Sequence, residues 1–431
     1  MRIVACAYQR LEFLSVPQPF VLLKTGLAGR GHRWSLLGWE PWWSWNPSCG
    51  DPLICMDDVL ADVKNICGGD IVCEFPLPAV MGAISYDFGA RKTLSVPLTQ
   101  PSPQRERDTD ALLFAMRRVV VMDEVAQCGW EIFFDERVAV SPSERPPHPT
   151  LSQRGEGLPQ SNFTRDGYVA AIARIQSMIA AGDCYQVNLS QQWTAHTSCT
   201  APELFRRAID RNPAPMMALV ATSDVQIIST SPERLISRRG GQLISEPIKG
   251  TIARGSTTAK DLAAMQNLRA SAKDRAELAM IIDLVRNDLG RVAQTGSVQV
   301  IDAARIESYA NVHHLVATIQ AQARADLSWA EIFRAMFPGG SITGCPKEQA
   351  MQVIAELEPD PRGFYCGSIG YIDARGDGDW NIAIRTITQC GTTVRFNLGG
   401  GIVYDSDPAA EYEETLRKGE TLFGLLDDAA L

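Results

Sequence analysis

The sequence is poor in the features that mark zinc proteins, disulfide-bonded proteins and nucleic-acid-binding proteins. It has only five histidines and no H-E-x-x-H motif, so a metal ion would be held by carboxylates, which favours magnesium over zinc. Its eleven cysteines form no C-x-x-C pair, and their odd number and scattered positions indicate reduced thiols. The net charge is −9 and lysine and arginine form no stripe, which argues against nucleic acid and acidic membranes as partners.

Long hydrophobic runs are also missing. No uninterrupted apolar run reaches the roughly 18 residues that span a bilayer, and the first ten residues have too short an apolar stretch for a signal peptide. We therefore expect a cytoplasmic protein. A chain of 431 residues with 45% hydrophobic and 21% charged residues has the ordinary composition of an enzyme with a sizeable core.

A segment rich in proline, serine and charge divides the chain. Residues 141–162 hold little that could be buried, so we predict an exposed linker between an N-terminal region, 1–140, and a larger region, 163–425. We expect strands at 112–121, 130–134, 187–193 and 394–403. Helices are expected at 168–181, at 261–292 as one helix or two, and from Asp407-Pro408 onward. Hairpins of strands and blocks of helices predict an α+β fold with antiparallel sheets.

Glu233 and Lys249 stand on the two sides of a predicted hairpin. Apolar and β-branched residues flank Gly240-Gly241, which is a strong signal for a tight turn. A two-residue turn places Glu233 opposite Ile248, and a three-residue turn places it opposite Lys249, so the two charges are neighbours in either register. Two interpretations stay open at this point: a surface ion pair of little energetic value, or a general acid beside an amine nucleophile in one site.

Two predicted helices each carry acidic residues on one face. Asp274 and Glu277 are spaced i, i+3, and Glu411, Glu414 and Lys418 are spaced i, i+3 and i+7. Two carboxylate pairs suit a hard cation such as Mg²⁺. The alternative is that both helices show solvated faces, since acidic residues also suit a helix N-terminus.

Two further features predict contacts to a ligand. Gly399-Gly400-Gly401 follows an apolar strand, and backbone without side chains can approach an anion closely. Arg385 is a lone charge among alternating apolar residues, and a buried arginine needs an anion from the protein or from a substrate carboxylate.

Taken in order, these segments resemble the chorismate-utilising enzymes, which include the anthranilate, aminodeoxychorismate, isochorismate and salicylate synthases. The resemblance covers about residues 163–425, and residues 1–140 look like the more variable N-terminal part of the same fold. It implies an α+β fold of two large, mainly antiparallel β-sheets packed face to face with helices on the outside. The matching segments are 182–190 (GDCYQVNLS), 231–234 (SPER), 247–251 (PIKGT), 274–277, 283–291 (DLVRNDLGR), 313–314 (HH) and 344–347 (GCPK), followed by Arg385, the triple glycine and 411–418.

Two positions separate the members of this family. Gln186 stands where isochorismate and salicylate synthases have a water-activating lysine, so this chain looks like an ammonia-using enzyme. Lys249 stands where anthranilate synthases typically have alanine, and in its P-I-K-G-T setting it resembles the aminodeoxychorismate synthases, which serve 4-aminobenzoate and folate biosynthesis. The alternatives are component I of an anthranilate synthase and, more remotely, a non-catalytic tryptophan-binding regulatory module.

The resemblance also implies a role for each matching residue. Glu233 would protonate the departing C4 hydroxyl of chorismate and Lys249 would attack C2. Mg²⁺ would be held by Glu277 and Glu414, with Asp274 and Glu411 in support. The expected substrate-binding residues are Gly250, Thr251, His314, Ser341, Tyr365, Arg385, Gly399, Gly400, Gly401 and Lys418.

A nucleophilic lysine must be neutral, and a neighbouring carboxylate ordinarily raises its pKa. The conflict is removed if the pair shares one mobile proton, since burial favours protonated Glu233 with neutral Lys249 over two charges. The sequence shows no glutaminase triad, so the resemblance implies a separate glutaminase subunit that supplies ammonia.

An N-terminal aromatic stretch completes the set of predictions. The resemblance implies an L-tryptophan site between the sheets, where relatives bind it. Its residues here would be Ser35, in the run from Arg33 to Pro41, together with Pro215, Met216 and Met217. The aromatic residues here can equally fill their own core, and both interpretations stay open.

Overall fold

The structure of the protein is a computed structural model that describes residues 2–11, 16–25, 33–46, 50–67, 73, 75–94, 110–134 and 159–426. Most of the predicted linker therefore lies outside the described residues. Its last part, residues 159–162, is described, and Gln160–Ser161 form the short strand β7.

Within the described residues the chain forms twenty strands and nine α-helices, whose bounds follow here in chain order. The strands are β1 (Arg2–Ala7), β2 (Phe20–Lys24), β3 (Trp34–Ser44), β4 (Pro78–Ile84), β5 (Ala111–Asp123), β6 (Cys128–Phe133), β7, β8 (Gln186–His196), β9 (Met216–Ala221), β10 (Gln226–Ser231), β11 (Arg234–Arg239), β12 (Gln242–Glu246), β13 (Ile248–Ala253), β14 (Gln299–Ser308), β15 (Val312–Gln322), β16 (Gly344–Cys345), β17 (Ser368–Asp373), β18 (Gly378–Asn381), β19 (Thr386–Cys390) and β20 (Thr393–Ile402). The helices are α1 (Pro52–Cys67), α2 (Tyr86–Leu94), α3 (Arg165–Ala181), α4 (Ala201–Arg211), α5 (Thr258–Ala270), α6 (Ala272–Gly290), α7 (Trp329–Met336), α8 (Lys347–Leu357) and α9 (Pro408–Leu426), with a 3₁₀ turn, η4 (Gly340–Ile342).

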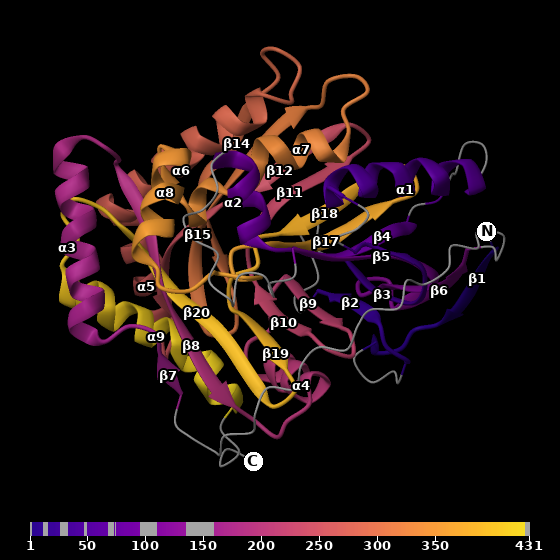
Figure 1. Ribbon diagram of the computed structural model, residues 1–431, viewed down its shortest axis with the longest axis horizontal. Coiled ribbons are helices and arrows are strands. Elements are labelled where there is room, and N and C mark those ends of the chain that lie inside the picture. Colours follow the sequence, from indigo (N-terminus) through magenta and orange to yellow (C-terminus); the bar gives the residue numbers. More distant parts are fainter. Residues whose placement is uncertain are drawn as a thin grey trace.

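The strands form one continuous antiparallel sheet with two arms that meet at β5 (Figure 1). One edge of β5 pairs with β3, and the first arm continues through β2, β9, β10, β19 and β20 to β8. The other edge of β5 pairs with β4, and the second arm continues through β17, β18, β11 and β12 to β15 and its neighbours β13 and β14. The predicted α+β antiparallel fold is confirmed, and the two expected sheets are hydrogen-bonded into one.

Two short crossovers carry the chain from one arm to the other. The first joins β10 to β11 through Pro232-Glu233, and the second joins β18 to β19 through residues 382–385. They are hydrogen-bonded side by side: the Ile382 N–H donates to the Glu233 carbonyl at 3.0 Å, and the Thr230 N–H donates to the Arg385 carbonyl at 3.1 Å. These hydrogen bonds hold Thr230 next to Arg385, although the two residues are about 150 positions apart in sequence.

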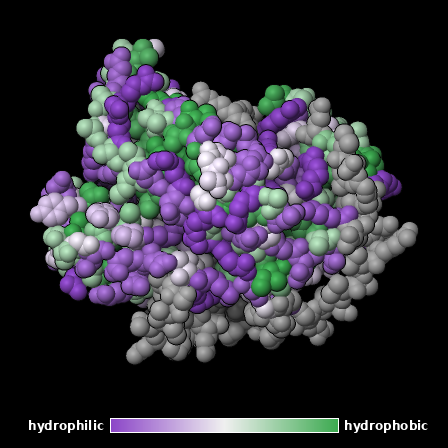
Figure 2. Space-filling model, turned by 90° about the horizontal axis from the view of Figure 1, so that it is seen from above, coloured by the Kyte–Doolittle hydropathy of each residue, from purple (hydrophilic) through white to green (hydrophobic). Residues whose placement is uncertain are grey.

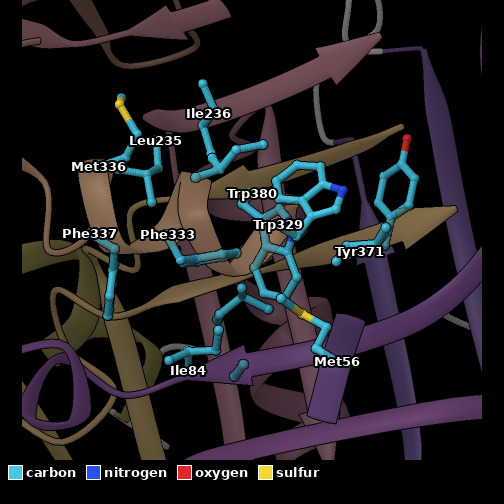
Figure 3. Packing of buried hydrophobic residues seen from close by; sticks show 14 of the residues in the cluster. Met56, Ile84, Leu235, Ile236, Trp329, Phe333, Met336, Phe337, Tyr371 and Trp380 are labelled. Atoms are coloured by element: carbon cyan, nitrogen blue, oxygen red, sulfur yellow. The ribbon is translucent and has the colours of Figure 1, made fainter. Parts of the chain in front are cut away.

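The largest part of the core lies between the second arm and helices α1 and α7 (Figure 3). Trp329, Phe333 and Trp380 are at most 1% exposed, and the rings of Phe333 and Trp380 meet edge to face with centroids 5.0 Å apart, a favourable aromatic geometry. The two carboxylate oxygens of Asp57 accept hydrogen bonds from the N–H groups of Trp329 and Ala330, so α1 satisfies the N-terminus of α7.

The predicted elements agree well with the structure. The helix expected at 168–181 is α3, which begins three residues earlier and ends at the same residue. The block at 261–292 is two helices, because Ser271 ends α5 and its hydroxyl accepts from the Asp274 N–H at the start of α6. The last helix begins at Pro408, as predicted.

The surface is mainly hydrophilic in the view from above, with hydrophobic residues in small separate patches (Figure 2). Among the described residues, no helix combines the length and hydropathy needed to span a bilayer.

Candidate active site

The predicted hairpin exists, and a bulge adjusts its register. Gly240 and Gly241 have φ of 53° and 83°, a backbone that glycine adopts without strain, and Arg239 pairs with Gln242 across the turn. Between Ser237 and Arg234 the pairing shifts by one residue. The carboxylate of Glu233 accepts a hydrogen bond from the backbone N–H of Ile248, the residue before Lys249.

Glu233 is a buried acid with an elevated pKa. It is 3% exposed, and its Oε1 accepts a 2.6 Å hydrogen bond from the Ser341 hydroxyl on η4. Burial raises its pKa to about 7, although the Ser341 hydroxyl, Lys249 and the Ile248 N–H act in the opposite direction. A surface ion pair, the plainer interpretation of the sequence, does not describe this residue.

Lys249, on β13 of the second arm, lies beside Gly401 on β20 of the first arm. Burial lowers its pKa, against the opposing effect of Glu277 and other carboxylates. A Cβ placed on Gly401 of β20 would stand 2.4 Å from Gln186 Nε2 and 3.3 Å from Lys249 Nζ, so only glycine fits at that position. Gln186, Gly401 and Lys249 therefore surround one small space.

The raised pKa of Glu233 and the lowered pKa of Lys249 both favour moving one proton from the lysine to the carboxyl. The structure thus has the electrostatic arrangement that a general acid beside a neutral amine requires. Such paired and opposed shifts are typical of active sites.

Arg385 and His314 form a second polar group beside the crossovers. Arg385 Nη2 lies 3.3 Å from His314 Nε2, and since a guanidinium only donates, Nε2 is the acceptor and the ring proton is on Nδ1. His314 Nδ1 lies 2.8 Å from the Thr251 hydroxyl. Burial and the adjacent Arg385 lower the pKa of His314 to about 3, so the imidazole is neutral and holds the Arg385 fork in place.

The two helices that carry the predicted carboxylates, α6 and α9, face each other across Lys273; they are called the carboxylate helices below. Its Nζ is 4.0 Å from Glu277 on α6 and 3.9 Å from Glu411 on α9, and Lys418 pairs with Glu414 at 2.8 Å. Burial raises the pKa of Glu277, and Asp274 and Glu411 raise it further by repulsion. The structure therefore brings the four predicted carboxylates onto facing helices, with lysines among them.

These carboxylates are chemically suited to Mg²⁺, which prefers oxygen ligands. Their mutual repulsion is the observation that fits a cation, because like charges held together are stabilised by a positive charge between them. Among the described residues no three His, Cys, Asp or Glu side chains converge as metal ligands.

The triple glycine lies between these groups. Lys418 Nζ donates to the Gly399 carbonyl at 3.1 Å, and the side of Gly400 faces Glu411. Gly250, with φ of 75°, lies against Asp274 of α6. Tyr365 is buried beside Arg362 and Cys366.

The residues predicted to bind L-tryptophan do not all lie in one pocket. Pro215, Met216 and Met217 line a pocket between the two arms, together with Lys24 and Asp379. Ser35 does not line it: its hydroxyl donates to Glu124 and is near the Thr25 N–H at 3.3 Å. The tryptophans of β3 pack largely into the core, with Trp39 and Trp42 6% and 8% exposed.

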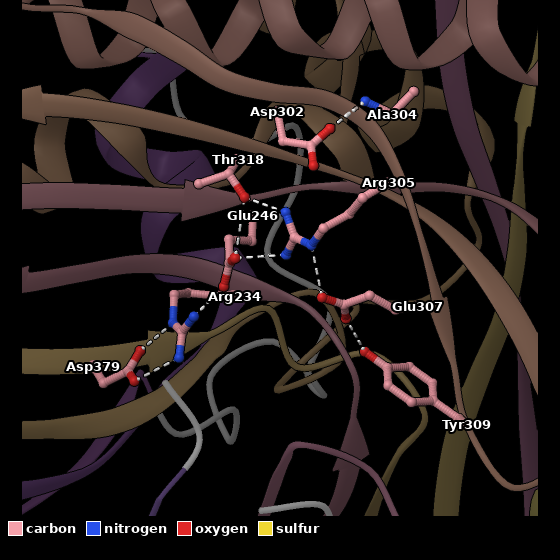
Figure 4. Close-up of polar contacts among 9 residues, drawn as sticks. All are labelled: Arg234, Glu246, Asp302, Ala304, Arg305, Glu307, Tyr309, Thr318 and Asp379. Carbon is pink, nitrogen blue, oxygen red and sulfur yellow. Dashed lines mark hydrogen bonds and ion pairs between the residues drawn. The ribbon is translucent and has the colours of Figure 1, made fainter. Parts of the chain in front are cut away.

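An ion network that the sequence did not predict begins at Arg234, the residue after Glu233 (Figure 4). Arg234 pairs with Glu246 and, at 2.8 Å, with Asp379. Glu246 also accepts from Arg305 at 2.6 Å, and the network continues through Glu307 to the Tyr309 hydroxyl at 2.7 Å. The ring of Tyr309 meets that of His314 edge to face. Arg305 and Glu307 alternate along β14 and pair with each other, but the partners of Arg234 come from β12 and β18.

A second missed group is the ion pair of Glu358 and Arg362. Both are buried, at 8% and 3% exposure. Glu358 accepts from the Ser190 N–H at 2.8 Å, and Arg362 donates to the carbonyls of Asn188 and Ile342 at 2.6 and 2.9 Å. The pair completes the edge of β8 beyond the short strand β16 and holds η4, which carries Ser341.

Solved structures with this architecture are chorismate-utilising enzymes. Anthranilate synthase component I from Streptococcus pneumoniae matches with a TM-score of 0.75 and 26% identity over 92% of this chain and 93% of its own. The menaquinone-specific isochorismate synthase from Escherichia coli matches with a TM-score of 0.75 over 99% and 94%, at 19% identity, which shows the shared fold.

The chain belongs to the family described as chorismate binding enzyme, whose model matches residues 49–424. Aminodeoxychorismate synthase component 1 of Klebsiella aerogenes is 46% identical over 259 residues, 60% of this chain and 57% of that protein. Anthranilate synthase component 1 of Pseudomonas aeruginosa is 34% identical over 409 residues, 87% of this chain and 80% of that protein. The chain thus matches little more than half the length of the aminodeoxychorismate synthase and most of the anthranilate synthase.

Proposed function

We propose that the chain is component 1 of an aminodeoxychorismate synthase, which converts chorismate and ammonia to 4-amino-4-deoxychorismate for 4-aminobenzoate and folate biosynthesis. The observation that carries the proposal is the pair of opposed pKa shifts at Glu233 and Lys249 in one buried site. The 46% identity to an aminodeoxychorismate synthase component 1 supports it.

The first step uses Lys249 as nucleophile and Glu233 as acid. The neutral amine forms a bond to C2 of chorismate, the ring double bonds shift, and the C4–oxygen bond breaks. Glu233 gives its proton to the departing hydroxyl, which leaves as water. Arg385, whose guanidinium contacts neutral His314, would bind a substrate carboxylate.

The second step restores both residues. Ammonia forms a bond to C4, the double bonds shift back, and the C2–nitrogen bond to Lys249 breaks. The ammonium formed at C4 gives one proton to the Glu233 carboxylate. The overall change is chorismate plus ammonia to aminodeoxychorismate plus water.

Mg²⁺ is proposed as the cofactor, held by Glu277 and Glu414 with Asp274 and Glu411 in support. When bound, the ion would neutralise a ring carboxylate of the substrate. A separate glutaminase subunit is proposed as the source of ammonia, in keeping with the word component in the relative's name.

A covalent adduct tests the proposal directly. Chorismate mixed with the chain without ammonia and quenched in acid should add the mass of dehydrated chorismate to Lys249, located by peptide mass spectrometry. The Lys249→Ala chain should show no such adduct. A turnover-competent wild-type chain that never carries the adduct would contradict the role of Lys249.

Anthranilate synthase component I remains the second candidate, because those relatives match this chain over more of their length. The two functions differ in product. Chorismate with an ammonium salt should give aminodeoxychorismate, detected through an added lyase as 4-aminobenzoate, whereas fluorescent anthranilate as the main product would favour the second candidate.

L-Tryptophan is a proposed ligand of the pocket beside Pro215 and Met217. Isothermal titration with L-tryptophan should give saturable binding that a Met217→Trp variant abolishes by filling the pocket. Absence of binding by the wild-type chain would favour the interpretation that the aromatic residues serve the core alone.

A further inference from the structure

Arg385 combines a strained backbone with a charge that has no carboxylate partner in the protein. Its φ of 51° lies in the left-handed region, which is uncommon for a residue other than glycine. Among the described residues, its guanidinium makes one hydrogen bond, to His314, and no salt bridge with a carboxylate. Backbone strain of this kind persists where surrounding contacts maintain it, and such residues are concentrated at functional sites.

The end of β10 maintains the strained backbone. The Thr230 N–H and the Thr230 hydroxyl both donate to the Arg385 carbonyl, at 3.1 and 3.2 Å. Burial lowers the pKa of Arg385, although the nearby Tyr309 and Glu233 act in the opposite direction. The backbone of Arg385 is therefore fixed, and its desolvated guanidinium needs an anion from a ligand.

The direction of the guanidinium depends on His314. Arg385 Nη2 lies 3.3 Å from His314 Nε2. The imidazole is 1% exposed, and its Nδ1 lies 2.8 Å from the Thr251 hydroxyl. The ring of Tyr309 meets the imidazole edge to face, with centroids 5.3 Å apart and an interplanar angle of 66°. Aromatic contacts of this geometry are favourable and fix the tilt of a ring.

Tyr309 is itself held by the ion network of Figure 4. Its hydroxyl donates to Glu307 at 2.7 Å, Glu307 accepts from Arg305 at 2.8 Å, and Arg305 also donates to Glu246 at 2.6 Å. Burial and the charge of Glu307 raise the pKa of Tyr309, so its hydroxyl stays protonated and remains a donor. The ring that contacts His314 is thus anchored to strands β14 and β12.

Resting on the proposed function, in which Arg385 binds a substrate carboxylate, we propose that Tyr309 is a positioning residue for that carboxylate. The ion network holds the Tyr309 ring, the ring holds His314, and His314 directs the Arg385 fork. A fork that is fixed before the substrate arrives loses less entropy when a carboxylate accepts its two N–H groups. Tyr309 acts through His314 and not on the reacting atoms, so it contributes to substrate binding and not to the proton transfers.

Steady-state kinetics of the whole chain, with ammonium chloride as the nitrogen source, test this role. Tyr309→Phe keeps the ring and removes the hydroxyl that donates to Glu307, whereas Tyr309→Leu also removes the ring that contacts His314. We expect the KM for chorismate to rise about threefold in Tyr309→Phe and about tenfold in Tyr309→Leu. The kcat and the KM for ammonium should stay near the wild-type values, because Glu233 and Lys249 are unchanged.

A matched control is Tyr168→Phe. The Tyr168 hydroxyl donates to the Leu189 carbonyl at 2.9 Å, and its ring meets that of Phe163 edge to face. This variant loses one hydrogen bond of a buried tyrosine, as Tyr309→Phe does, but on α3 and away from Arg385. It should lose stability in urea and keep the wild-type KM for chorismate.

A double-mutant cycle with Arg385 separates positioning from general damage. Chorismate binding is measured by isothermal titration on chains that carry Lys249→Ala, in which the proposed covalent adduct cannot form. Tyr309→Leu should raise the Kd for chorismate about tenfold where Arg385 is present. It should raise the Kd by less than about twofold in chains that carry Arg385→Gln, since no fork is left to be positioned.

Each outcome supports or overturns the role of Tyr309. Equal effects of Tyr309→Leu with and without Arg385 would overturn positioning and leave the proposed function intact, and so would a wild-type KM for chorismate in both Tyr309 variants. If Tyr309→Leu fails to fold, Tyr309→Phe decides in the same cycle, since it removes a single atom. A wild-type chain that does not bind chorismate overturns the proposed function and the positioning role together.

Discussion

The two crossovers and the two carboxylate helices both bring charged groups to the site, but they hold these groups in different ways. Glu233 on the first crossover is 3% exposed and accepts from Ser341 and the Ile248 backbone. Glu414 on α9 has 43% of its side chain exposed and is paired with a flexible lysine. Protein hydrogen bonds fix the first group, whereas a half-exposed lysine side chain pairs with the second group.

This difference indicates a division of work. Groups that transfer protons must be held at fixed distances before the substrate arrives. Groups that bind a reversible cation need solvent access and room to move. The predictions below ask how far the two regions differ, beginning with the largest expected effect.

Replacing the fixed acid should cost the most activity. Glu233→Gln keeps the shape and the hydrogen bond from Ser341 but cannot donate an acidic proton, so kcat should fall about 10²- to 10⁴-fold. The KM for chorismate should change little, and steady-state kinetics with ammonium chloride would measure both. A fall in kcat of less than about fivefold would remove Glu233 from the role of general acid.

Stability should show the same contrast between buried and exposed pairs. Arg362→Met leaves Glu358 charged and unpaired in the interior, which should cost about 3–5 kcal/mol of unfolding free energy. Lys418→Met breaks the half-exposed pair with Glu414 and should cost about 1 kcal/mol or less. Urea denaturation followed by circular dichroism would compare them, and equal losses would refute the contrast.

Cation binding should depend on the helices and not on the crossovers. Glu277→Gln removes a charged ligand, so the Kd for Mg²⁺ by isothermal titration should rise about tenfold or more. Glu233→Gln is the matched control and should bind Mg²⁺ normally. An unchanged Kd in Glu277→Gln would mean that α6 does not hold the ion.

A smaller effect should appear in the pH dependence of Ser341→Ala. Glu233 must be protonated to act as an acid, so kcat/KM at fixed free ammonia should fall as the pH rises through the pKa of about 7. The Ser341 hydroxyl stabilises the carboxylate and lowers this pKa, so its removal should move the basic limb to higher pH. A limb that stays in place or moves to lower pH would contradict this assignment.

Much of the fold and part of the site could be predicted from the sequence, because they depend on local signals. The turn at Gly240-Gly241, the end of α3 before Gly182 and the start of α9 at Pro408 all follow from short-range rules. The shared position of Glu233 and Lys249 also followed from hairpin geometry. Their opposed pKa shifts were expected only on the condition that the pair is buried, and the burial itself comes from strands far apart in the chain.

The parts that could not be predicted involve partners far apart in the chain. Arg362 donates to Asn188, which lies 174 positions away, and Arg234 pairs with Asp379, which lies 145 positions away. No periodicity or spacing encodes such contacts. Likewise, the joining of two expected sheets into one depends on β5 pairing along both edges, which a single strand pattern does not reveal.

The position of β5 has a mechanical consequence. Among the described strands it pairs at its two edges with the strands that begin the two arms, while Lys249 and Gly401 lie far along those arms. The two arms are thus joined at two places, at β5 and at the crossovers beside Glu233. A substitution that weakens the pairing of β5 would loosen one of these two joints without replacing a residue of the site.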